Sequence, residues 1–279
     1  MKLQSFTEML ALAKKKHFAV GGFNVVNMET IQAVTRAADR AGSPVIIQVY
    51  HDDLNFGGAA YYAAMVNAAA GEVSVPVCLS LDHGQKFEQA IECIEAGFSG
   101  VMIDLSTEDF DTNVAAAREV VKAAHARGVS VEAELGKIFD ADSSLEKIAS
   151  GYTDPKTAGE FVRQTGIDSL AVSIGTAHGT YAVKPKINFR LLEELITIDI
   201  PIVVHGGSDI PDADVLEIVR LGTAKLNIGT DLMKAYNQGI IETLKDVSAP
   251  PRTVMANARR RVEEVVAHKL GLLNHYREG

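Results

Sequence analysis

The apolar run Val75–Leu81 is followed directly by Asp82-His83-Gly84, in the stretch VPVCLSLDHG at residues 75–84. A short apolar run of this kind predicts a buried strand, and the polar residues after it predict the loop into which the strand opens. Neighbouring residues on a strand point to opposite faces, so the carboxylate and the imidazole can converge only where the strand has ended. Taken alone, the pair favours an ordinary turn with a surface histidine.

Similar apolar runs recur along the chain, and each is followed by a polar or glycine-bearing turn and an alanine-rich amphipathic segment. The predicted strands are Ala19–Phe23, Val45–Val49, Val75–Leu81, Gly100–Ile103, Ser130–Ala133, Ser169–Val172, Ile202–Val204 and Ala224–Ile228. The predicted helices are Met28–Ala41, Gly57–Ala70, Phe87–Ala96, Phe110–Ala126, Pro155–Thr165, Phe189–Ile196, Asp212–Leu221 and Asp231–Leu244. Continuous apolar strands imply burial on both faces.

Eight strand–helix units in one series predict an α/β fold, a TIM (β/α)₈ barrel formed by one domain over residues 1–279. A doubly wound open sheet is the alternative, but no G-x-G-x-x-G follows the first strand. An extra N-terminal helix is expected after Ser5-Phe6-Thr7-Glu8, which has the spacing of a capping box. A C-terminal helical extension, Arg252–Leu270, has no strand to cover and is expected to pack outside the barrel or on a neighbouring molecule.

The composition narrows the classes of partner. The 279 residues carry a formal net charge of −9 and no long basic run, which argues against nucleic acid and anionic membranes. Cys78 and Cys93 lie in apolar stretches without CxxC spacing, which predicts buried thiols in a reducing compartment. The N-terminal apolar run is too short for a membrane span, and its lysines follow it, unlike those of a signal peptide. We therefore expect a soluble, cytoplasmic protein.

Polar residues gather just past the predicted strands, where a barrel places its active site. They are Asn24, Gln48, Asp82, His83, Asp104, Glu132, Glu134, His178, His205, Asn227, Gly229, Thr230 and Asp231. His83, His178 and His205 follow strands 3, 6 and 7, and three imidazoles with an open fourth position suit a catalytic zinc. A single histidine favours a structural role, but three at matching positions favour Zn²⁺. The remaining histidines are expected to be solvated: His17, His51, His125, His268 and His275.

Two glycine-bearing loops follow strands 7 and 8. They are Gly206-Gly207-Ser208, before a predicted helix, and Asn227–Asp231, before the next one. Barrels often bind phosphate there, on loop amides and a helix N-terminus. One such loop would be an ordinary tight turn, whereas two neighbouring loops predict a shared phosphate site.

These segments resemble the class II, metal-dependent aldolases of fructose bisphosphate and tagatose bisphosphate over nearly the whole chain. The resemblance lies in LSLDHG (79–84), VMIDLS (101–106), VSVEAELG (129–136), GIDSLAVSIGTAHG (166–179), PIVVHGGSDIP (201–211) and LGTAKLNIGTD (221–231). It implies a zinc-dependent lyase of carbohydrate metabolism that cleaves a ketose phosphate or bisphosphate reversibly to dihydroxyacetone phosphate and an aldehyde. The zinc would stabilise the enediolate as a Lewis acid.

The resemblance also implies roles for individual residues. His83, His178 and His205 match the zinc ligands, and Asp82 matches the acid that exchanges a proton with the aldehyde oxygen. Asp104 and Glu134 match an alternative metal position. The substrate and phosphate group, with an accessory monovalent cation (Na⁺ or K⁺), would be held among Asn24, Gly179, Gly206, Gly207, Ser208, Asn227, Gly229, Thr230 and Asp231. Arg252 matches an arginine lent to the neighbouring subunit, so a homodimer or homotetramer is expected.

The chain departs from this family's pattern at two places. After strand 5 the family carries a glycine pair and a glutamate that moves a proton; here Phe139-Asp140 and Asp142 stand instead. Asp142 is the predicted catalytic base, with Asp140 as the alternative. After strand 2 a serine usual in the family is replaced by Tyr50, followed by His51-Asp52-Asp53, which predicts a different distal group on the substrate.

The sequence is also compatible with two functions other than an aldolase. A non-catalytic accessory or phosphosugar-binding member of the same family is the alternative, but the three histidines and Asp82 are all present. A zinc hydrolase would use the same histidines, yet it gives no reason for the two phosphate loops. The sequence does not identify the ketose, the aldehyde or the stereochemistry.

Overall fold

Eight parallel strands close into a barrel in the computed structural model, whose described residues are 3–181, 185–244 and 248–278. They are β1 (Val20–Asn24), β2 (Val45–Tyr50), β3 (Val77–Asp82), β4 (Gly100–Ile103), β5 (Ser130–Leu135), β6 (Ser169–Val172), β7 (Ile202–Val204) and β8 (Lys225–Ile228). The strands pair in chain order, and β8 returns to β1, where Val20 is in register with Lys225. The predicted (β/α)₈ barrel is confirmed, and the open sheet is excluded.

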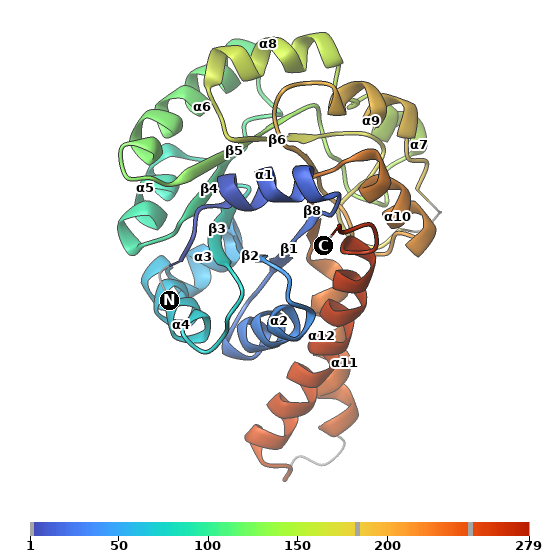
Figure 1. Ribbon diagram of the computed structural model, residues 1–279. Coiled ribbons are helices and arrows are strands. Elements are labelled where there is room, and N and C mark those ends of the chain that lie inside the picture. Colours follow the sequence, from blue (N-terminus) through green and yellow to red (C-terminus); the bar gives the residue numbers. More distant parts are fainter. Residues whose placement is uncertain (1–2, 182–184, 245–247, 279) are drawn as a thin grey trace.

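Helices surround the barrel (Figure 1). They are α1 (Phe6–Lys16), α2 (Met28–Ala41), α3 (His51–Gly57), α4 (Ala59–Ala70), α5 (Phe87–Ala96), α6 (Phe110–His125), α7 (Leu145–Ala149), α8 (Pro155–Thr165), α9 (Phe189–Ile196), α10 (Asp212–Leu221), α11 (Thr230–Thr243) and α12 (Pro251–Leu273). The predicted ranges for α2, α5, α8, α9 and α10 agree with the structure at both ends. None of the helices within the described ranges has the length and apolar character that a membrane span requires.

Two loops at the C-terminal ends of the strands contain helices that the sequence pattern did not predict. The segment after β2 forms α3, and Gly58, with a φ of 81°, separates α3 from α4. Helix α4 therefore begins at Ala59, two residues after the predicted start at Gly57. The stretch 136–152, predicted to be irregular, contains the short helix α7. Helix α11 begins at Thr230 rather than Asp231. Helices as short as α3 and α7 contain too few apolar repeats to be recognised from hydrophobic periodicity.

The prediction that His51 is solvated is wrong. His51 begins α3 and is buried, and its ring packs against that of Tyr50, with the two ring centroids 4.1 Å apart. The other four histidines predicted to be solvated are exposed, namely His17, His125, His268 and His275. Both cysteines are buried and free, as predicted.

Helix α1 lies across the N-terminal end of the barrel (Figure 1). Its apolar face, which includes Phe6 and Leu10, packs with Ile46 and Cys78 from inside the barrel. The expected capping box is wrong, because the Ser5 side chain makes no capping hydrogen bond. Instead the main-chain N–H of Gln4 donates to the carbonyl of Val77 at 2.9 Å, which anchors the chain to the barrel. With this end covered, the opposite end is left for a site.

Helices α11 and α12 form a hairpin that extends beyond the barrel (Figure 1). Gly239 of α11 allows a close approach, because a Cβ there would lie 2.6 Å from the Cα of Ala258 in α12. Helix α12 also contacts α2, and Arg259 donates to the Gln32 side chain at 2.7 Å. The C-terminal extension therefore packs on the outside of its own barrel, one of the two arrangements expected.

Candidate active site

A pocket of about 420 Å³ opens at the C-terminal ends of the strands. Loops after β1, β2, β3, β5, β6, β7 and β8 all contribute to its wall. The sequence-predicted residues that line it are Asn24, Asp82, His83, Asp140, His178, Gly179, Gly206, Ser208, Asn227, Gly229 and Thr230. Residues from seven loops thus meet at one mouth, as the barrel topology requires.

A larger hollow, of about 920 Å³, lies between the loop 209–211 and helices α11 and α12. Its wall holds charged groups that are already paired, such as Arg261 with Glu242 at 2.6 Å and Lys269 with Asp231 at 2.9 Å. It includes none of the three site histidines. We therefore place the chemistry in the smaller pocket.

The backbone at the end of β3 brings Asp82 and His83 to the same side. Asp82 is the last residue of the strand, and His83 has a φ of 50°, in the left-handed region. Gly84 follows and lets the chain pass close to β4, because a Cβ there would lie 2.5 Å from the carbonyl oxygen of Met102. A non-glycine residue with positive φ is uncommon and here serves the site.

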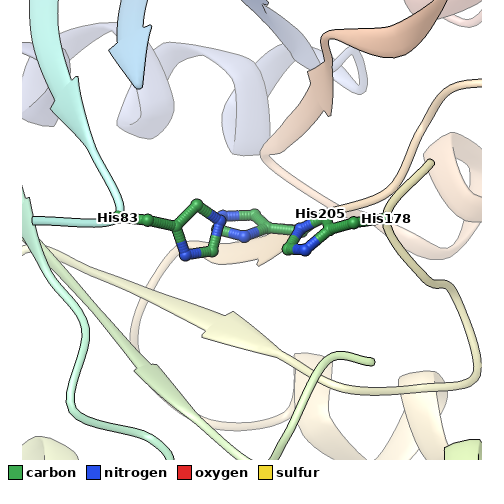
Figure 2. A group of neighbouring side chains, drawn as sticks. All are labelled: His83, His178 and His205. Carbon is green, nitrogen blue, oxygen red and sulfur yellow. The ribbon is translucent and has the colours of Figure 1, made fainter. Parts of the chain in front are cut away.

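His83, His178 and His205 converge from the ends of β3, β6 and β7 (Figure 2). The ring centroid of His83 lies 5.0 Å from that of His178 and 4.7 Å from that of His205. One nitrogen of each ring lies within 4.8 Å of the others. This spacing lets all three imidazoles reach one ion at the Zn–N distance of roughly 2.0–2.1 Å.

Hydrogen bonds determine which ring nitrogens are free. Nδ1 of His83 lies 2.6 Å from Oδ2 of Asp104, and Nε2 of His205 lies 3.1 Å from Oε1 of Glu132. The free nitrogens are therefore Nε2 of His83 and Nδ1 of His205. A carboxylate on the outer nitrogen is the usual support of a metal-ligating histidine.

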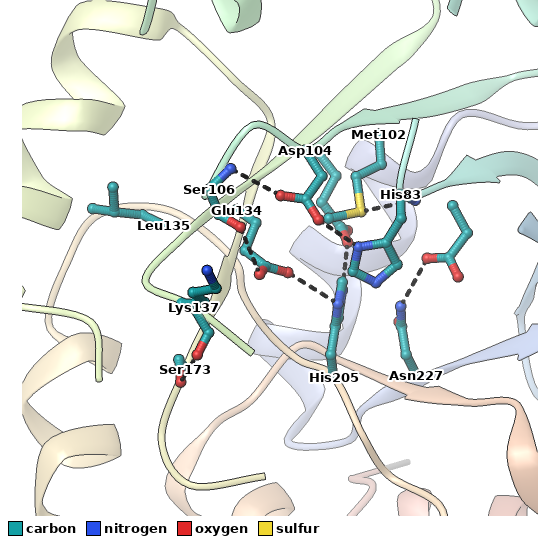
Figure 3. Close-up of polar contacts among 12 residues, drawn as sticks. His83, Met102, Asp104, Ser106, Glu134, Leu135, Lys137, Ser173, His205 and Asn227 are labelled. Atoms are coloured by element: carbon teal, nitrogen blue, oxygen red, sulfur yellow. Dashed lines mark hydrogen bonds and ion pairs between the residues drawn. The ribbon is translucent and has the colours of Figure 1, made fainter. Parts of the chain in front are cut away.

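Asp104 and Glu134 form a second potential ligand group with His83 (Figure 3). Ser106 holds both carboxylates: its N–H donates to Asp104 at 3.0 Å and its hydroxyl donates to Glu134 at 3.1 Å. Oε2 of Glu134 lies 3.3 Å from Nδ1 of His205, but the two atoms are not aligned for a hydrogen bond.

The donor set fits a divalent metal ion. Oε2 of Glu134 and Nδ1 of His205 are both buried without a hydrogen-bond partner, and such groups are costly unless something binds them. Imidazole nitrogens together with carboxylate oxygens suit Zn²⁺ and similar transition metals. The two overlapping groups share His83, which offers an ion two neighbouring positions.

The histidines differ in protonation when no ion is present. Burial lowers the pKa of His83, but Asp82 and then the hydrogen bond to Asp104 outweigh this and raise the pKa to about 10. Burial, and then repulsion from His83 and His205, lowers the pKa of His178 to about 3. His178 is therefore neutral at neutral pH and free to bind a metal ion, whereas His83 must lose a proton first.

Asp82 is buried and held by three amide side chains. Asn24 donates to its Oδ2 at 2.7 Å, while Gln48 and Asn227 donate to its Oδ1 at 2.8 Å and 3.2 Å. Burial raises the pKa of Asp82, but His83, together with the other nearby positive groups and these bonds, lowers it below the ordinary value. Asn24 and Asn227, predicted to bind substrate, thus line the pocket and also orient the carboxylate.

Lys225 and Glu132 form a buried ion pair beneath the histidines. Nζ of Lys225 lies 2.9 Å and 2.8 Å from the two carboxylate oxygens of Glu132, which in turn holds His205. The sequence pattern predicts Glu132 at the mouth of the barrel but indicates no role for it. The alternation Glu132-x-Glu134 was the available signal, because residues two apart on a strand face the same side.

The predicted phosphate loops meet at the pocket. Gly179, Gly206, Ser208, Gly229 and Thr230 line it, and α11 begins at Thr230. Gly206 has a φ of 69°, and a Cβ there would lie 2.4 Å from the carbonyl oxygen of Ala177. Backbone and a helix N-terminus therefore reach the pocket together, an arrangement that favours an anion.

Gly207 and Asp231, which were also predicted to hold the substrate and phosphate group, do not line the pocket. Gly207 donates its N–H to the carbonyl of Asn227 at 2.8 Å, which ties the two loops together. The carboxylate of Asp231 accepts from the N–H of Asp209 and pairs with Lys269 at 2.9 Å. Both residues brace the loops, because their polar groups are used within the protein.

The loop after β5 brings one of its two aspartates to the pocket. Asp140 lines the pocket next to His178, and the N–H of Ala141 donates to the carbonyl of His178 at 2.8 Å. Both aspartates are exposed to solvent, but Asp142, the predicted base, is not part of the pocket wall. The main-chain pairing with His178 selects Asp140, and no local sequence pattern could have shown it.

The wall after β2 consists of Tyr50 and Asp53. The Tyr50 ring lies edge-on to His83, with centroids 6.1 Å apart. Burial, and then the neighbouring Asp52, raises the pKa of Asp53. Arg252 is exposed in the first turn of α12 and does not line this chain's pocket.

The family model described as fructose-bisphosphate aldolase class-II matches residues 4–277. A Bacillus subtilis (strain 168) protein named "Probable fructose-bisphosphate aldolase" is 43% identical over 97% of each chain. A fructose-bisphosphate aldolase of Staphylococcus aureus (strain N315) is 37% identical over 97% of this chain and 96% of its own. The crystal structure of the YdjI aldolase from Escherichia coli K12 superposes with a TM-score of 0.86 at 33% identity, over 97% of each chain.

Proposed function

The chain belongs to the class-II fructose-bisphosphate aldolase family, and from this premise we propose that it is a metal-dependent aldolase acting on a ketose phosphate. The reaction would cleave the C3–C4 bond reversibly to dihydroxyacetone phosphate and an aldehyde. The observation that carries the proposal is the convergence of His83, His178 and His205 beside the buried carboxylate of Asp82.

We assign the metal site to Zn²⁺ held by the three histidines, with Asp104 and Glu134 as its second position. A zinc ion bound there would act as a Lewis acid beside the ketose carbonyl. The protein's own contribution is to orient the rings, since Asp104 and Glu132 occupy the outer nitrogens of His83 and His205.

Asp82 is assigned the proton transfer at the C4 oxygen. In cleavage its carboxylate takes the proton from the C4 hydroxyl as the C3–C4 bond breaks, and in synthesis it returns the proton to the aldehyde oxygen. The three amide donors hold both carboxylate oxygens in place without providing a competing charge. A positioned acid–base group of this kind contributes about 100- to 10,000-fold to rate.

Asp140 is assigned the proton transfer at C3 of the three-carbon product. This replaces the sequence-based choice of Asp142, because Asp140 lines the pocket beside His178 and Asp142 does not. After cleavage, C3 must gain a proton before dihydroxyacetone phosphate can leave; the protonated carboxyl group of Asp140 would donate it and then take up a proton from solvent.

The C1 phosphate is assigned to the loops of Gly179, Gly206, Ser208, Gly229 and Thr230. The described lining of this pocket contains no lysine or arginine. An accessory Na⁺ or K⁺ beside these loops would therefore offset phosphate charge that the amides and the α11 N-terminus leave uncompensated. Arg252 would act in a neighbouring copy of a homodimer or homotetramer, because it lies away from its own pocket.

A retro-aldol assay with coupled detection of dihydroxyacetone phosphate tests the proposal. The metal-loaded protein should cleave at least one ketose phosphate, chelator should abolish the activity, and Zn²⁺ should restore it. Full activity in a protein shown to be free of metal would contradict it. Metal bound at one ion per chain without cleavage of any ketose phosphate would instead support the non-catalytic phosphosugar-binding alternative.

A further inference from the structure

Tyr50 and Asp53 form the part of the pocket wall that the proposed chemistry leaves unused. Tyr50 is the last residue of β2, and Asp53 lies in the first turn of α3. Both line the same pocket as His83 and His178. Whatever the pocket accepts beyond the reacting carbons must lie near this wall.

The direction of a bound substrate follows from the other walls. The phosphate loops come from β6, β7 and β8, and the histidines and Asp82 surround the reacting carbons. A ketose held by its C1 phosphate and its carbonyl therefore directs its remaining carbons toward the loops after β1, β2 and β5. These loops contribute Val26, Tyr50, Asp53 and Asp140.

The charges on this side oppose a second phosphate. Asp53 and Asp140 are acidic, and no lysine or arginine is found among the described residues that line the pocket. A phosphate dianion placed beside the Asp53 carboxylate is repelled by its like charge.

The same groups suit a neutral polyhydroxy chain. A carboxylate accepts hydrogen bonds from hydroxyl groups, and the Tyr50 hydroxyl can donate or accept. The Tyr50 ring, 36% exposed, offers an apolar face to the C–H groups of a sugar. The pocket of about 420 Å³ lies within the usual range for small-molecule sites.

We propose that the substrate is a ketose 1-phosphate whose distal end is uncharged and hydroxylated, and that Asp53 and Tyr50 select it against the bisphosphate. The selection rests on the proposed aldolase function and concerns the aldehyde half of the reaction. The aldehyde product is then an unphosphorylated hydroxyaldehyde.

Matched pairs of substrates test this selection. The metal-loaded enzyme is assayed with the 1-phosphates and the 1,6-bisphosphates of fructose, tagatose and sorbose, and kcat/KM is compared within each pair. The 1-phosphate should be favoured by roughly tenfold or more in the pair with the preferred stereochemistry, a modest value for a like-charge contact. Asp53→Asn should reduce that preference by roughly tenfold, since it removes the charge and keeps the shape.

Asp52→Asn is the matched control. It removes the same charge one residue away, but the Asp52 side chain is 76% exposed and does not line the pocket. Its substrate preference should stay within about twofold of wild type, because solvent screens an exposed charge. An equal effect of both variants would show a general field and overturn the role of Asp53.

The outcomes separate this inference from the proposed function. Wild-type preference for the bisphosphates overturns the inference and leaves the aldolase function standing. Loss of that bisphosphate preference in Arg252→Ala would then identify a neighbouring copy as the source of the distal cation. Cleavage of no member of any pair overturns both.

Discussion

Nζ of Lys225 lies 2.8 Å from Oε2 of Glu132 inside the barrel, and both side chains are buried. Glu132 also accepts from Ser169 at 3.0 Å and holds Nε2 of His205. Burial raises the pKa of Glu132, but Lys225 outweighs it and lowers the pKa to about 2. The Lys225–Glu132 pair therefore links the interior of the barrel to His205, one of the proposed metal ligands.

Breaking the Lys225–Glu132 pair on one side should destabilise the protein. Lys225→Met leaves a buried carboxylate without its cation, which typically costs about 3–5 kcal/mol of unfolding free energy. Lys225→Met/Glu132→Gln removes both charges and should recover part of that loss. Chemical denaturation of the metal-free proteins measures both values, and equal stability of the single and double variants would contradict the explanation.

Glu132 should also affect the affinity for metal through the ring of His205. Lys225→Met/Glu132→Leu removes the hydrogen-bond acceptor at Nε2, whereas Lys225→Met/Glu132→Gln keeps one. The leucine variant should bind Zn²⁺ about 10- to 100-fold more weakly, as is usual when the outer support of a ligating histidine is lost. Competition with a chromophoric chelator gives the affinities, and the ¹⁵N shifts of His205 report its tautomer. Matching affinities in the two double variants would limit Glu132 to a structural role.

Asp82→Asn should separate metal binding from turnover. The asparagine keeps the size of the side chain and the histidines are untouched, so the metal content should remain one ion per chain. Turnover of the ketose phosphate should fall by about 100- to 10,000-fold, because the amide cannot exchange the C4 hydroxyl proton. Metal analysis and steady-state kinetics provide the two measurements. A variant that keeps full turnover would exclude Asp82 from the proton transfer.

Asp140 and Asp142 can be distinguished by the exchange of the C3 hydrogen of dihydroxyacetone phosphate with D₂O. Asp140→Asn should slow this exchange by about 100-fold or more, because Asp140 lines the pocket and is the proposed proton donor at C3. Asp142→Asn removes the same charge from the same loop but from outside the pocket, and it should retain the exchange. Proton NMR follows both reactions. The reverse result would restore Asp142 as the base.

The metal-free protein should lose stability at alkaline pH through His83. Its pKa rises from 6.5 to about 10 on folding, since Asp82 and Asp104 outweigh the effect of burial. A raised pKa stabilises the folded state fully below pH 6.5, and the gain disappears as the pH rises through about 10. The difference should amount to a few kcal/mol. Denaturation at pH 6 and pH 10 measures it, and His83→Asn should show a smaller change than wild type.

Much of the site could be predicted because it lies directly after the strands. His83, His178 and His205 follow local apolar runs, and the barrel topology alone brings such ends together. The choice between Asp140 and Asp142 could not be made, because it depends on main-chain pairing with His178. The bracing role of Asp231 was missed for a similar reason: its partner, Lys269, lies 38 positions later, in α12.

The sequence by itself determined the order of strands and helices, the closed barrel and the residues available at its mouth. These follow from hydrophobic period and turn residues, which act over a few neighbouring positions. Only the tertiary structure decided the division of labour between Asp82 and His83, through the left-handed backbone at His83 and amide donors from β1, β2 and β8. It also decided which imidazole nitrogens are free and which aspartate faces the pocket. Such choices depend on contacts between strands distant in the chain, and no local pattern encodes them.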